Sequence, residues 1–254
     1  MRLDQYLKEH AYFESRHKAS IAIKNGAVSV NDRVVKKPSF LVPLTPKIEF
    51  VKSVNPYVSQ GGLKLEKAIH DFNIDFNDKT VLDIGASSGG FTDCAIVHGA
   101  KKVFALDVGT NQLHPKIKDN TDVIVMENTN FLATKHHEFR NIDITVCDVS
   151  FISGLKILNH LNSIGINHEI VILIKPQFES LNTPKSGVIK NPKMHVKILR
   201  HYLDSVVHMG FTISGLTPSP IKGQSGNKEF LLYLGTKELN IEIDTLIKTA
   251  TSLG

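Results

Sequence analysis

The chain has 254 residues, of which 41% are hydrophobic and 22% charged, with two cysteines and no tryptophan. This composition is typical of a folded globular protein and excludes disordered and fibrous classes, while the length allows one large or two unequal domains. The densest apolar run is far shorter than the roughly 18 residues of a membrane span, and the N-terminus has no secretion signal, so we expect a cytoplasmic protein without a membrane span.

Positive charge is concentrated at the start of the chain. Residues 1–56 contain ten Lys or Arg and five Asp or Glu, whereas residues 57–254 contain twenty of each, so the whole net charge of +5 lies in the first fifth of the chain. Such a segment is typical of a part that binds a polyanion. Nucleic acid is favoured over a membrane because no large basic amphipathic face is evident. A solvated basic surface without a partner is the alternative.

The first 56 residues predict a small α+β unit. Residues 3–7 place three apolar side chains on one helical face, and Ser15 is suited to begin a second helix that ends at Asn25-Gly26. Valines on both sides of Asn31-Asp32 predict a β-hairpin. The basic residues that we expect to bind the polyanion are Arg2, Arg16, Lys18, Lys24, Arg33, Lys36 and Lys37.

The periodic pattern is lost between Pro43 and Pro56, where we place a linker that ends the first domain at residue 56. In residues 57–254, strand-like apolar runs alternate with helical stretches, which predicts an α/β domain with a parallel sheet wrapped by helices. No crossover helix is evident between the last two runs, so we expect the last strand to be antiparallel. The predicted strands are Thr80–Ile84, Lys102–Asp107, Val123–Met126, Ile144–Cys147, Ile170–Ile174, Phe211–Leu216 and Phe230–Leu234.

A glycine-rich turn, VLDIGASSGGFTD, follows the first of these strands at residues 81–93. Glycines let a ligand approach the backbone closely, and the start of a helix offers free N–H groups. Ser87 stands where a dinucleotide site would have its second glycine, so the pattern favours a nucleoside without a pyrophosphate, namely S-adenosylmethionine. A tight turn without a ligand is the alternative. The expected cofactor-binding residues are Asp83, Gly85, Ser87, Gly89, Gly90, Phe91 and Asp107.

Two of these residues have more specific expectations. Asp107 ends the second predicted strand, where its carboxylate is placed to bind ribose hydroxyls. Phe91 follows the glycines directly, and we expect its ring to pack against the loop rather than to stack on an adenine.

Four charged residues stand at the ends of predicted core strands. Asp148 and Lys175 each follow a strand, Glu229 precedes one, and Lys64 comes before the first. Because the carboxyl ends of the strands form the ligand crevice of an open α/β sheet, we expect Asp148 and Lys175 to face each other there. A buried lysine with a like-charged neighbour has a lowered pKa and can act as a base. For each residue taken singly, a solvated charge or a structural ion pair is the alternative.

Motifs along almost the whole chain resemble one protein family. In order, they are MRLDQYL, SRHKAS, IKNGAVSVNDRVVKKP, YVSQGGLKLEKA, LDIGASSGGFTD, ALDVGTNQL, CDVSFIS, LIKPQFE and SPIKGQSGNKEFLLYL. The chain is thereby similar to the TlyA-type family, whose members were first named haemolysins and are ribosomal RNA 2′-O-methyltransferases by activity. So many ordered motifs make the resemblance specific.

The resemblance implies an RNA-binding domain at residues 1–56, of a type first seen in a small-subunit ribosomal protein, and a Rossmann-like methyltransferase domain at residues 57–254. It implies S-adenosylmethionine as cofactor, ribosomal RNA or ribosomal subunits as partner, and the ribose 2′-hydroxyl of a cytidine as methyl acceptor. The Lys-Asp-Lys-Glu tetrad of related RNA 2′-O-methyltransferases falls on Lys64, Asp148, Lys175 and Glu229. We expect Lys175 to be the base, Lys64 to lower its pKa, and the two carboxylates to orient the amines.

The sequence departs from the family pattern at three positions. Gln60 replaces an arginine, Ser88 replaces a threonine, and Gln224 replaces a proline. These changes put in doubt only a contact with RNA or with a loop, because the tetrad and the glycines are intact.

Other functions agree with some of these motifs. A methyltransferase that acts on an RNA base is one such alternative, but residues 148–151 lack the two prolines that this class of enzyme has there. A ring-carbon methyltransferase would need Cys147 as nucleophile, yet this side chain should point away from the face of Asp148. An RNA-binding or ribosome-assembly module without catalysis and a membrane-lytic protein are the alternatives outside enzymes. Neither Cys94 and Cys147 nor the spacing of His195, His201 and His208 predicts a metal site.

Overall fold

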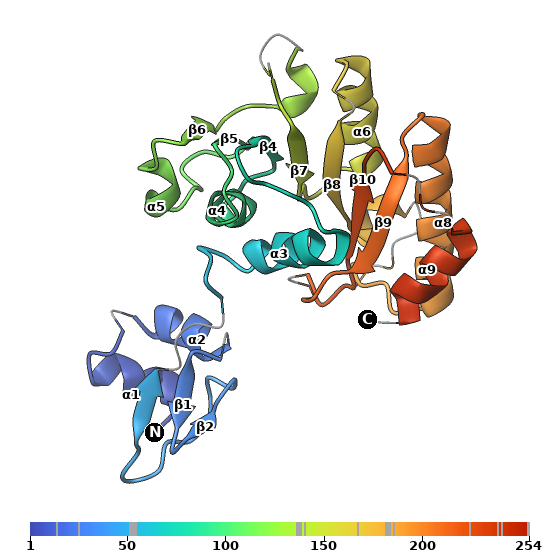
Figure 1. Cartoon of the computed structure of the whole chain (residues 1–254). Helices are drawn as coiled ribbons and strands as arrows, with labels where there is room; N and C mark the ends of the chain where they lie inside the picture. The colour runs from blue at the N-terminus through green and yellow to red at the C-terminus, as the bar shows by residue number, and fades with distance from the viewer. Residues whose placement is uncertain are drawn as a thin grey trace. The chain divides into compact units, whose positions relative to one another are not determined.

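The computed structural model describes residues 1–252 except 14, 25, 51–54, 136–138, 140, 167, 181–183, 185, 224, 238 and 240, and it describes only the backbone of residues 18 and 21. Contacts within the chain divide it into two units, Met1–Pro56 and Tyr57–Gly254 (Figure 1). Part of the predicted linker, residues 51–54, lies outside the described residues.

The first unit contains the two helices and the hairpin predicted from the sequence. Its elements are α1 (Leu3–Glu9), α2 (Arg16–Lys24), β1 (Val28–Val30), β2 (Arg33–Val34) and β3 (Ile48–Phe50). Ser15 directly precedes α2; Asn25, at the other end, lies outside the described residues, and Gly26 takes the left-handed φ of +73° that ends helices. A small core of α1, α2 and β1 side chains, including Leu3, Leu7 and Ile23, holds the unit together.

β3 was not predicted, because the alternation of Ile48, Glu49 and Phe50 is only three residues long and lies in a stretch interrupted by prolines. It pairs antiparallel with β1, so that the small sheet has the order β2-β1-β3. The hairpin turn contributes to this pairing, since the side chain of Asn31 accepts a hydrogen bond of 2.8 Å from the backbone N–H of Lys47, directly before β3. Tertiary contact with the turn therefore makes this segment a strand.

The second unit is built on a seven-stranded sheet of order β6-β5-β4-β7-β8-β10-β9. The strands are β4 (Thr80–Ile84), β5 (Lys102–Leu106), β6 (Val123–Met126), β7 (Ile144–Cys147), β8 (Glu169–Ile174), β9 (Ile213–Pro218) and β10 (Phe230–Leu234). β4 to β8 are parallel, and β10 lies between β8 and β9, antiparallel to both. The predicted antiparallel last strand is confirmed.

One predicted strand was wrong by two residues at both ends. β9 ends at Pro218 and not at Leu216, and it begins at Ile213, whereas the sequence predicted a start at Phe211. The preceding helix explains the difference, because the N–H of Phe211 still bonds the carbonyl of Val206 in the turn that closes that helix. The apolar Phe211 therefore belongs to the turn after α8 and not to the strand.

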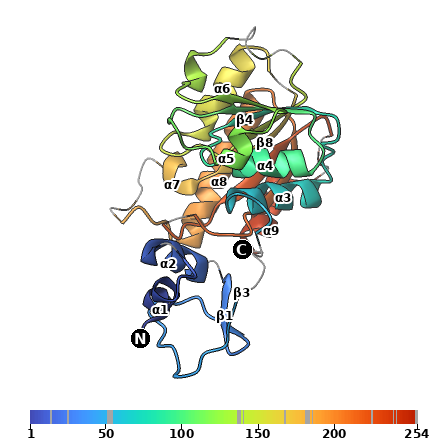
Figure 2. The same ribbon diagram turned by 90° about the vertical axis from the view of Figure 1, so that its left-hand side faces the viewer.

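Helices cover both faces of the large sheet (Figures 1 and 2). One face is covered by α3 (Gly61–Phe72) and α4 (Gly90–Val97), and the other by α6 (Gly154–Ser163), α8 (Pro192–His208) and α9 (Ile243–Ser252). Short helices lie in the connections: α5 (Pro115–Lys118), the 3-10 turn η1 (Phe131–Ala133) and α7 (Pro176–Glu179). β8 is apolar on both sides, with Ile170 and Ile172 facing the α6–α8–α9 layer and Val171 and Leu173 the other layer.

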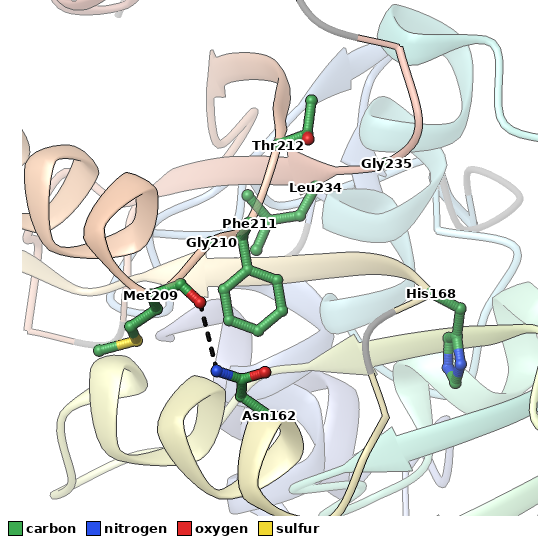
Figure 3. Close-up of a pocket in the computed structure, with 8 residues that line it drawn as sticks. All are labelled: Asn162, His168, Met209, Gly210, Phe211, Thr212, Leu234 and Gly235. Carbon is green, nitrogen blue, oxygen red and sulfur yellow. Dashed lines mark hydrogen bonds between the residues drawn. The ribbon is translucent and has the colours of Figure 1, made fainter.

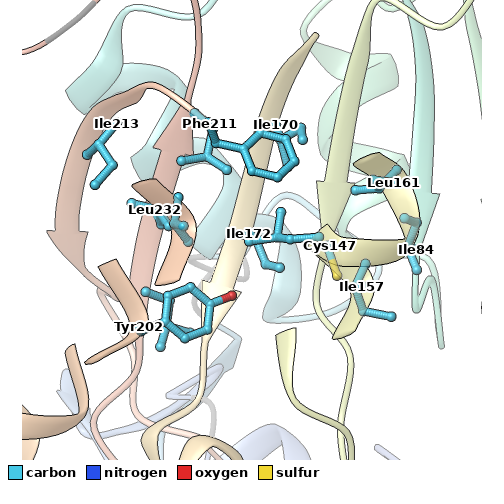
Figure 4. Packing of buried hydrophobic residues seen from close by; sticks show 14 of the residues in the cluster. Ile84, Cys147, Ile157, Leu161, Ile170, Ile172, Tyr202, Phe211, Ile213 and Leu232 are labelled. Atoms are coloured by element: carbon cyan, nitrogen blue, oxygen red, sulfur yellow. The ribbon is translucent and has the colours of Figure 1, made fainter. Parts of the chain in front are cut away.

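The larger core cluster contains one polar aromatic ring. Tyr202 on α8 is fully buried among side chains such as Ile172 and Leu232 (Figure 4). Its hydroxyl has no hydrogen-bond partner among the residues that the structure describes. Burial raises the pKa of Tyr202 well above its usual value, so the hydroxyl is neutral and contributes mainly packing.

β4 also buries a charged side chain. Asp83 is fully buried, and its Oδ2 accepts a hydrogen bond of 2.6 Å from the hydroxyl of Thr92 on α4. Its Oδ1 has no partner within the described part of the chain. Burial, with a smaller contribution from the charges of Asp148 and Asp107, raises the pKa of Asp83 to about 7.

Tyr202 allows a direct test of the packing. Tyr202→Phe should unfold with a free energy equal to or above that of the wild type, because an unpaired buried hydroxyl costs about 1–3 kcal/mol. Tyr202→Ala should lose about 3–5 kcal/mol through the cavity it leaves. Urea unfolding followed by circular dichroism measures both. A clear loss of stability in Tyr202→Phe would reveal a partner for the hydroxyl.

Asp83 should make stability depend on pH. Since its pKa is higher in the folded protein than the roughly 3.9 of an exposed aspartate, the unfolded chain releases this proton first, and stability falls as the pH rises from about 4 to about 7. Asp83→Asn keeps an acceptor for Thr92 but cannot ionise. The unfolding free energy of the wild type should therefore fall relative to Asp83→Asn by up to about 1.4 kcal/mol per pH unit in this range. Parallel pH profiles for the two proteins would contradict the assignment.

Candidate active site

A cavity of about 550 Å³ opens at the carboxyl edge of the parallel strands. The four charged residues singled out in the sequence all line it, and the structure brings them together from four elements. Lys64 comes from α3, Asp148 follows β7, Lys175 follows β8, and Glu229 precedes β10. Because β10 is antiparallel to β8, its N-terminal end lies at the same edge of the sheet as the C-terminal ends of β7 and β8.

The four groups form a chain of alternating charge. Lys64 Nζ lies 2.8 Å from Glu229 Oε2 and 3.3 Å from Asp148 Oδ2. Lys175 Nζ lies 2.6 Å from Asp148 Oδ1. Asp148 thus contacts both ammonium groups, one with each carboxylate oxygen, while Glu229, only 3% exposed, contacts Lys64.

Burial and charge act in opposite directions on Lys64. Burial alone would lower the pKa of its ammonium, but the two neighbouring carboxylates of Asp148 and Glu229 outweigh this effect and raise the pKa above its usual value. Lys64 is therefore held in its charged form. A buried ammonium between two carboxylates is suited to fixing their positions and unsuited to accepting a proton.

Lys175 has a neutral partner that sequence reasoning missed. Its Nζ donates a hydrogen bond of 2.8 Å to the hydroxyl of Ser150, and lies 6.0 Å from the centre of the Phe178 ring. Ser150 and Phe178 both line the cavity. Ser150 stands two residues after Asp148 within the motif CDVSFIS, so the motif itself was the available signal.

The neighbouring aromatic residue has an unusual conformation. Phe151 has a φ of +66°, which is strained for a residue with a bulky side chain, and it is 92% exposed although it lines the cavity. Its ring contacts that of Phe178, with centroids 5.3 Å apart. An exposed aromatic ring held in a strained backbone at the rim of a cavity is a candidate ligand contact.

The glycine-rich turn lies directly beside the tetrad. Gly85 has a φ of +85°, and a Cβ there would lie 2.9 Å from the carbonyl oxygen of Asp148. Only glycine fits where this turn passes so close to the segment after β7. Among the predicted cofactor-binding residues, those that line the cavity are Gly85, Ser87, Gly90 and Phe91.

Three other predicted cofactor residues do not line this cavity. Asp83 is buried against Thr92, and Gly89 takes a φ of +90° directly before α4. Asp107 lies beside the turn, where its carboxylate accepts hydrogen bonds from the backbone N–H groups of Ser87 (2.8 Å) and Gly109 (2.7 Å). In the structure these acids support the turn, and their contact with a ligand stays a prediction.

Two loops at the rim of the cavity are joined through one buried side chain. Asn227 Oδ1 accepts a hydrogen bond of 2.9 Å from the N–H of Ile189, and its Nδ2 donates one of 2.8 Å to the carbonyl of Gly187. Asn227 stands two residues before Glu229. Close by, a Cβ at Gly223 would lie 2.3 Å from Glu229 Oε1. The loop that carries Glu229 is thus fixed to the segment that precedes α8.

The positions that depart from the family pattern also lie near this site. Gln60 and Ser88 both line the cavity, whereas Gln224 lies outside the described residues.

A second, smaller cavity of about 100 Å³ lies at the opposite edge of the sheet (Figure 3). Asn162 at the end of α6 bonds the carbonyl of Met209 across it at 3.2 Å. His168 is the one titratable side chain among its lining residues, and burial lowers the pKa of this imidazole. Its small volume makes this cavity a weaker candidate for chemistry.

Two of the predicted basic residues in the first unit are engaged in ion pairs. Arg2 Nε lies 3.0 Å from Asp4 Oδ1, and Arg16 Nη2 lies 3.0 Å from Asp4 Oδ2. The hydrogen bond from Arg2, followed by that from Arg16, holds the pKa of Asp4 at about 2. The exposed basic side chains of this unit include Lys24, Arg33, Lys36 and Lys37. The side chain of Lys18 lies outside the described residues.

The other candidate groups do not join the tetrad. Cys147 is fully buried in the larger core cluster and is not among the residues that line the cavity, as the alternation of side chains along β7 predicts. His195 is buried on α8, while His201 and His208 are exposed. Within the described ranges, no three His, Cys, Asp or Glu are placed to hold a metal ion, and no helix is long and apolar enough to cross a membrane.

Comparison with known proteins adds to the geometry. Residues 57–236 match the FtsJ-like methyltransferase model, and residues 1–45 match the S4 domain. Hemolysin A of Brachyspira hyodysenteriae is 42% identical over 238 residues, covering 92% of this chain and 99% of that protein. The 23S rRNA (cytidine-2′-O)-methyltransferase TlyA of Campylobacter jejuni is 31% identical over 253 residues, covering 92% and 98%.

A solved structure of a protein named a hemolysin, from Streptococcus thermophilus, superposes with a TM-score of 0.75 at 35% identity and covers 99% of this chain and 96% of that one. The methyltransferase match alone spans more than half of the chain, and both relatives match over nearly their whole length. The chain therefore belongs to the FtsJ-like methyltransferase family, in the group that contains TlyA and Hemolysin A, and it carries an N-terminal S4 domain.

Proposed function

We propose that this protein transfers the methyl group of S-adenosylmethionine to the ribose 2′-hydroxyl of a cytidine in ribosomal RNA. The observation that carries the proposal is the alternating chain of Lys64, Asp148, Lys175 and Glu229 in one cavity with the glycine-rich turn. The name of the Campylobacter relative gives the same acceptor group, a cytidine ribose of 23S rRNA.

The residues of the cavity fit S-adenosylmethionine. The volume of about 550 Å³ is within the roughly 300–1,000 Å³ of small-molecule sites. The backbone of Gly85, Ser87 and Gly90 would hold the ligand. Each oxygen of Asp107 accepts one backbone N–H and keeps capacity for a second hydrogen bond, so this carboxylate would bind ribose hydroxyls at the turn. When bound, S-adenosylmethionine supplies a methyl group already activated by its sulfonium.

The tetrad supplies orientation and a proton acceptor. A ribose hydroxyl is a weak nucleophile, so the enzyme must align it with the methyl group and take its proton. We assign the proton to Lys175. Among the described residues its one carboxylate contact is with Asp148, which also contacts Lys64. Once the Lys175 ammonium has released its proton to water, its nitrogen would take the hydroxyl proton and pass it on to water in turn. The methyl group would move from the sulfonium to the ribose oxygen, so that its carbon–sulfur bond breaks as the carbon–oxygen bond forms. Lys64, charged throughout, keeps Asp148 and Glu229 in place.

Residues next to Lys175 are suited to the target nucleotide. Phe151 offers an exposed ring at the cavity, and Ser150 offers a hydroxyl beside Lys175. An unstacked base can stack on such an aromatic face, which would bring its ribose to the tetrad. The S4 domain supplies a separate basic surface for the phosphates of structured RNA.

The reaction is tested by transfer of labelled methyl from S-adenosylmethionine to purified ribosomal subunits. Wild type should label the ribose of one cytidine, and Lys175→Ala should react about 100- to 10,000-fold more slowly, as expected for loss of a proton acceptor. Lys248→Ala, which removes an exposed lysine of α9, is the matched control and should react like the wild type.

The other outcomes separate the alternatives. Label on a base, or full activity in Lys175→Ala, contradicts the proposed chemistry. Binding of S-adenosylmethionine without transfer to either subunit points to another methyl acceptor. Absence of cofactor binding makes the protein an RNA-binding module or a lytic protein, since neither function needs the cofactor.

The role of the S4 domain is tested by salt dependence. Replacing the exposed Lys36 and Lys37 with alanine should weaken RNA binding. The slope of log affinity against log salt concentration should become shallower by about 1.4–1.8, since each phosphate contact contributes about 0.7–0.9 to the magnitude of this slope. Filter binding or fluorescence anisotropy at several salt concentrations gives the slope, with Lys248→Ala again as control. An unchanged slope would show that these two lysines do not contact phosphates.

A further inference from the structure

The segment after β7, residues 148–153, is held on one side by α7. We call this segment the catalytic loop, since it carries Asp148, Ser150 and Phe151. α7 begins directly after Lys175 and has only four residues. It contacts the catalytic loop through the ring of Phe178 and also through its last residue, Glu179.

Glu179 makes two short hydrogen bonds at the end of the catalytic loop. Its Oε2 accepts a bond of 2.5 Å from the hydroxyl of Ser153, and its Oε1 accepts one of 2.7 Å from the backbone N–H of Gly154. Ser153 in turn caps α6 by accepting a bond from the N–H of Leu155. The carboxylate therefore lies at the N-terminus of a ten-residue helix, where negative charge is favourable.

The surroundings leave Glu179 little freedom to move. Burial raises the pKa of its carboxyl, against the opposing effect of its two hydrogen-bond donors. A Cβ at Gly154 would lie 2.5 Å from the hydroxyl oxygen of Tyr202 and 3.4 Å from Glu179 Oε1. The start of α6 is thus packed tightly against α8 on one side and against Glu179 on the other.

These bonds bracket the strained residue of the catalytic loop. A non-glycine residue with a conformation such as that of Phe151 is strained and persists only where its surroundings fix it. On one side, Ser150 is bonded to Lys175. On the other, Ser153 and Gly154 are bonded to Glu179. Both holding groups belong to the stretch from Lys175 to Glu179.

We propose that Glu179 is a positioning residue for methyl transfer: through Ser153 and Gly154 it fixes the catalytic loop against the segment that carries Lys175, and so sets where Ser150 and the Phe151 ring meet the target nucleotide. Glu179 is not among the residues that line the cavity, so it acts through the loop and not on the substrate. The inference rests on the proposed function.

The test compares Glu179→Ala with Glu179→Gln. The alanine variant loses both bonds, and we expect its kcat with RNA to fall about 10- to 100-fold, as for a small misplacement of reacting groups. The affinity for S-adenosylmethionine should stay unchanged, because the glycine-rich turn belongs to β4. Glutamine can accept from Gly154 and donate to Ser153, so it should restore most of the activity. Tyr202→Phe, altered in the same tight packing but in neither bond, is the matched control and should react like the wild type.

Each result bears on the proposal. A wild-type kcat in Glu179→Ala overturns the proposal. A glutamine variant that is as impaired as the alanine variant also overturns it, since the negative charge of Glu179 and not its two hydrogen bonds would then matter. If Glu179→Ala does not fold, Ser153→Ala removes one of the two bonds, and a wild-type kcat there also overturns the proposal.

Failure of the proposed function is seen separately. A wild-type protein that transfers no methyl group contradicts the proposed function. The bonds of Glu179 to Ser153 and Gly154 can then still be tested by amide hydrogen exchange. In that case, faster exchange of the Gly154 amide in Glu179→Ala than in Glu179→Gln supports the positioning role, and equal exchange overturns it.

Discussion

One carboxylate, that of Asp148, contacts two buried ammonium groups, and the geometry of the site depends on this arrangement. A buried charge without a partner is strongly unfavourable, so the four members of the tetrad hold each other in place. They come from α3, β7, β8 and β10, and each arrives at the same edge of the sheet. Glu229 can do so only because β10 runs antiparallel to its neighbours. The reversal of the last strand is thus a condition for the tetrad.

The strands of the large sheet and the meeting of Asp148 with Lys175 could be predicted from the sequence. Apolar runs identify buried strands, and the carboxyl ends of parallel strands share one edge. The place of β10 between β8 and β9 could not, because strand order depends on packing across the whole sheet. Nor could β3, whose alternating segment of three residues is too short to identify a strand and which pairs with β1 beside the Asn31 turn.

The hydrogen-bond partners of the acids near the glycine-rich turn could not be predicted from the sequence. Asp83 and Asp107 were both expected to bind the cofactor, and this contact stays a prediction. In the structure one is buried against Thr92 and the other bonds the backbone of the turn. A sequence gives the side of a strand on which a residue lies, but not whether the nearest donor belongs to the protein or to a ligand. The bond between Ser150 and Lys175 and the bonds that Glu179 accepts from Ser153 and Gly154 were not predicted either, because these partners are distant in the chain.

The two rim loops joined through Asn227 also connect the tetrad to a distant part of the sequence. Asn227 bonds both Ile189 and Gly187, and it stands two residues before Glu229. The carboxylate that contacts Lys64 is thus anchored to a segment about 40 residues earlier in the chain. The tetrad therefore depends on a segment that contributes no charged group to it.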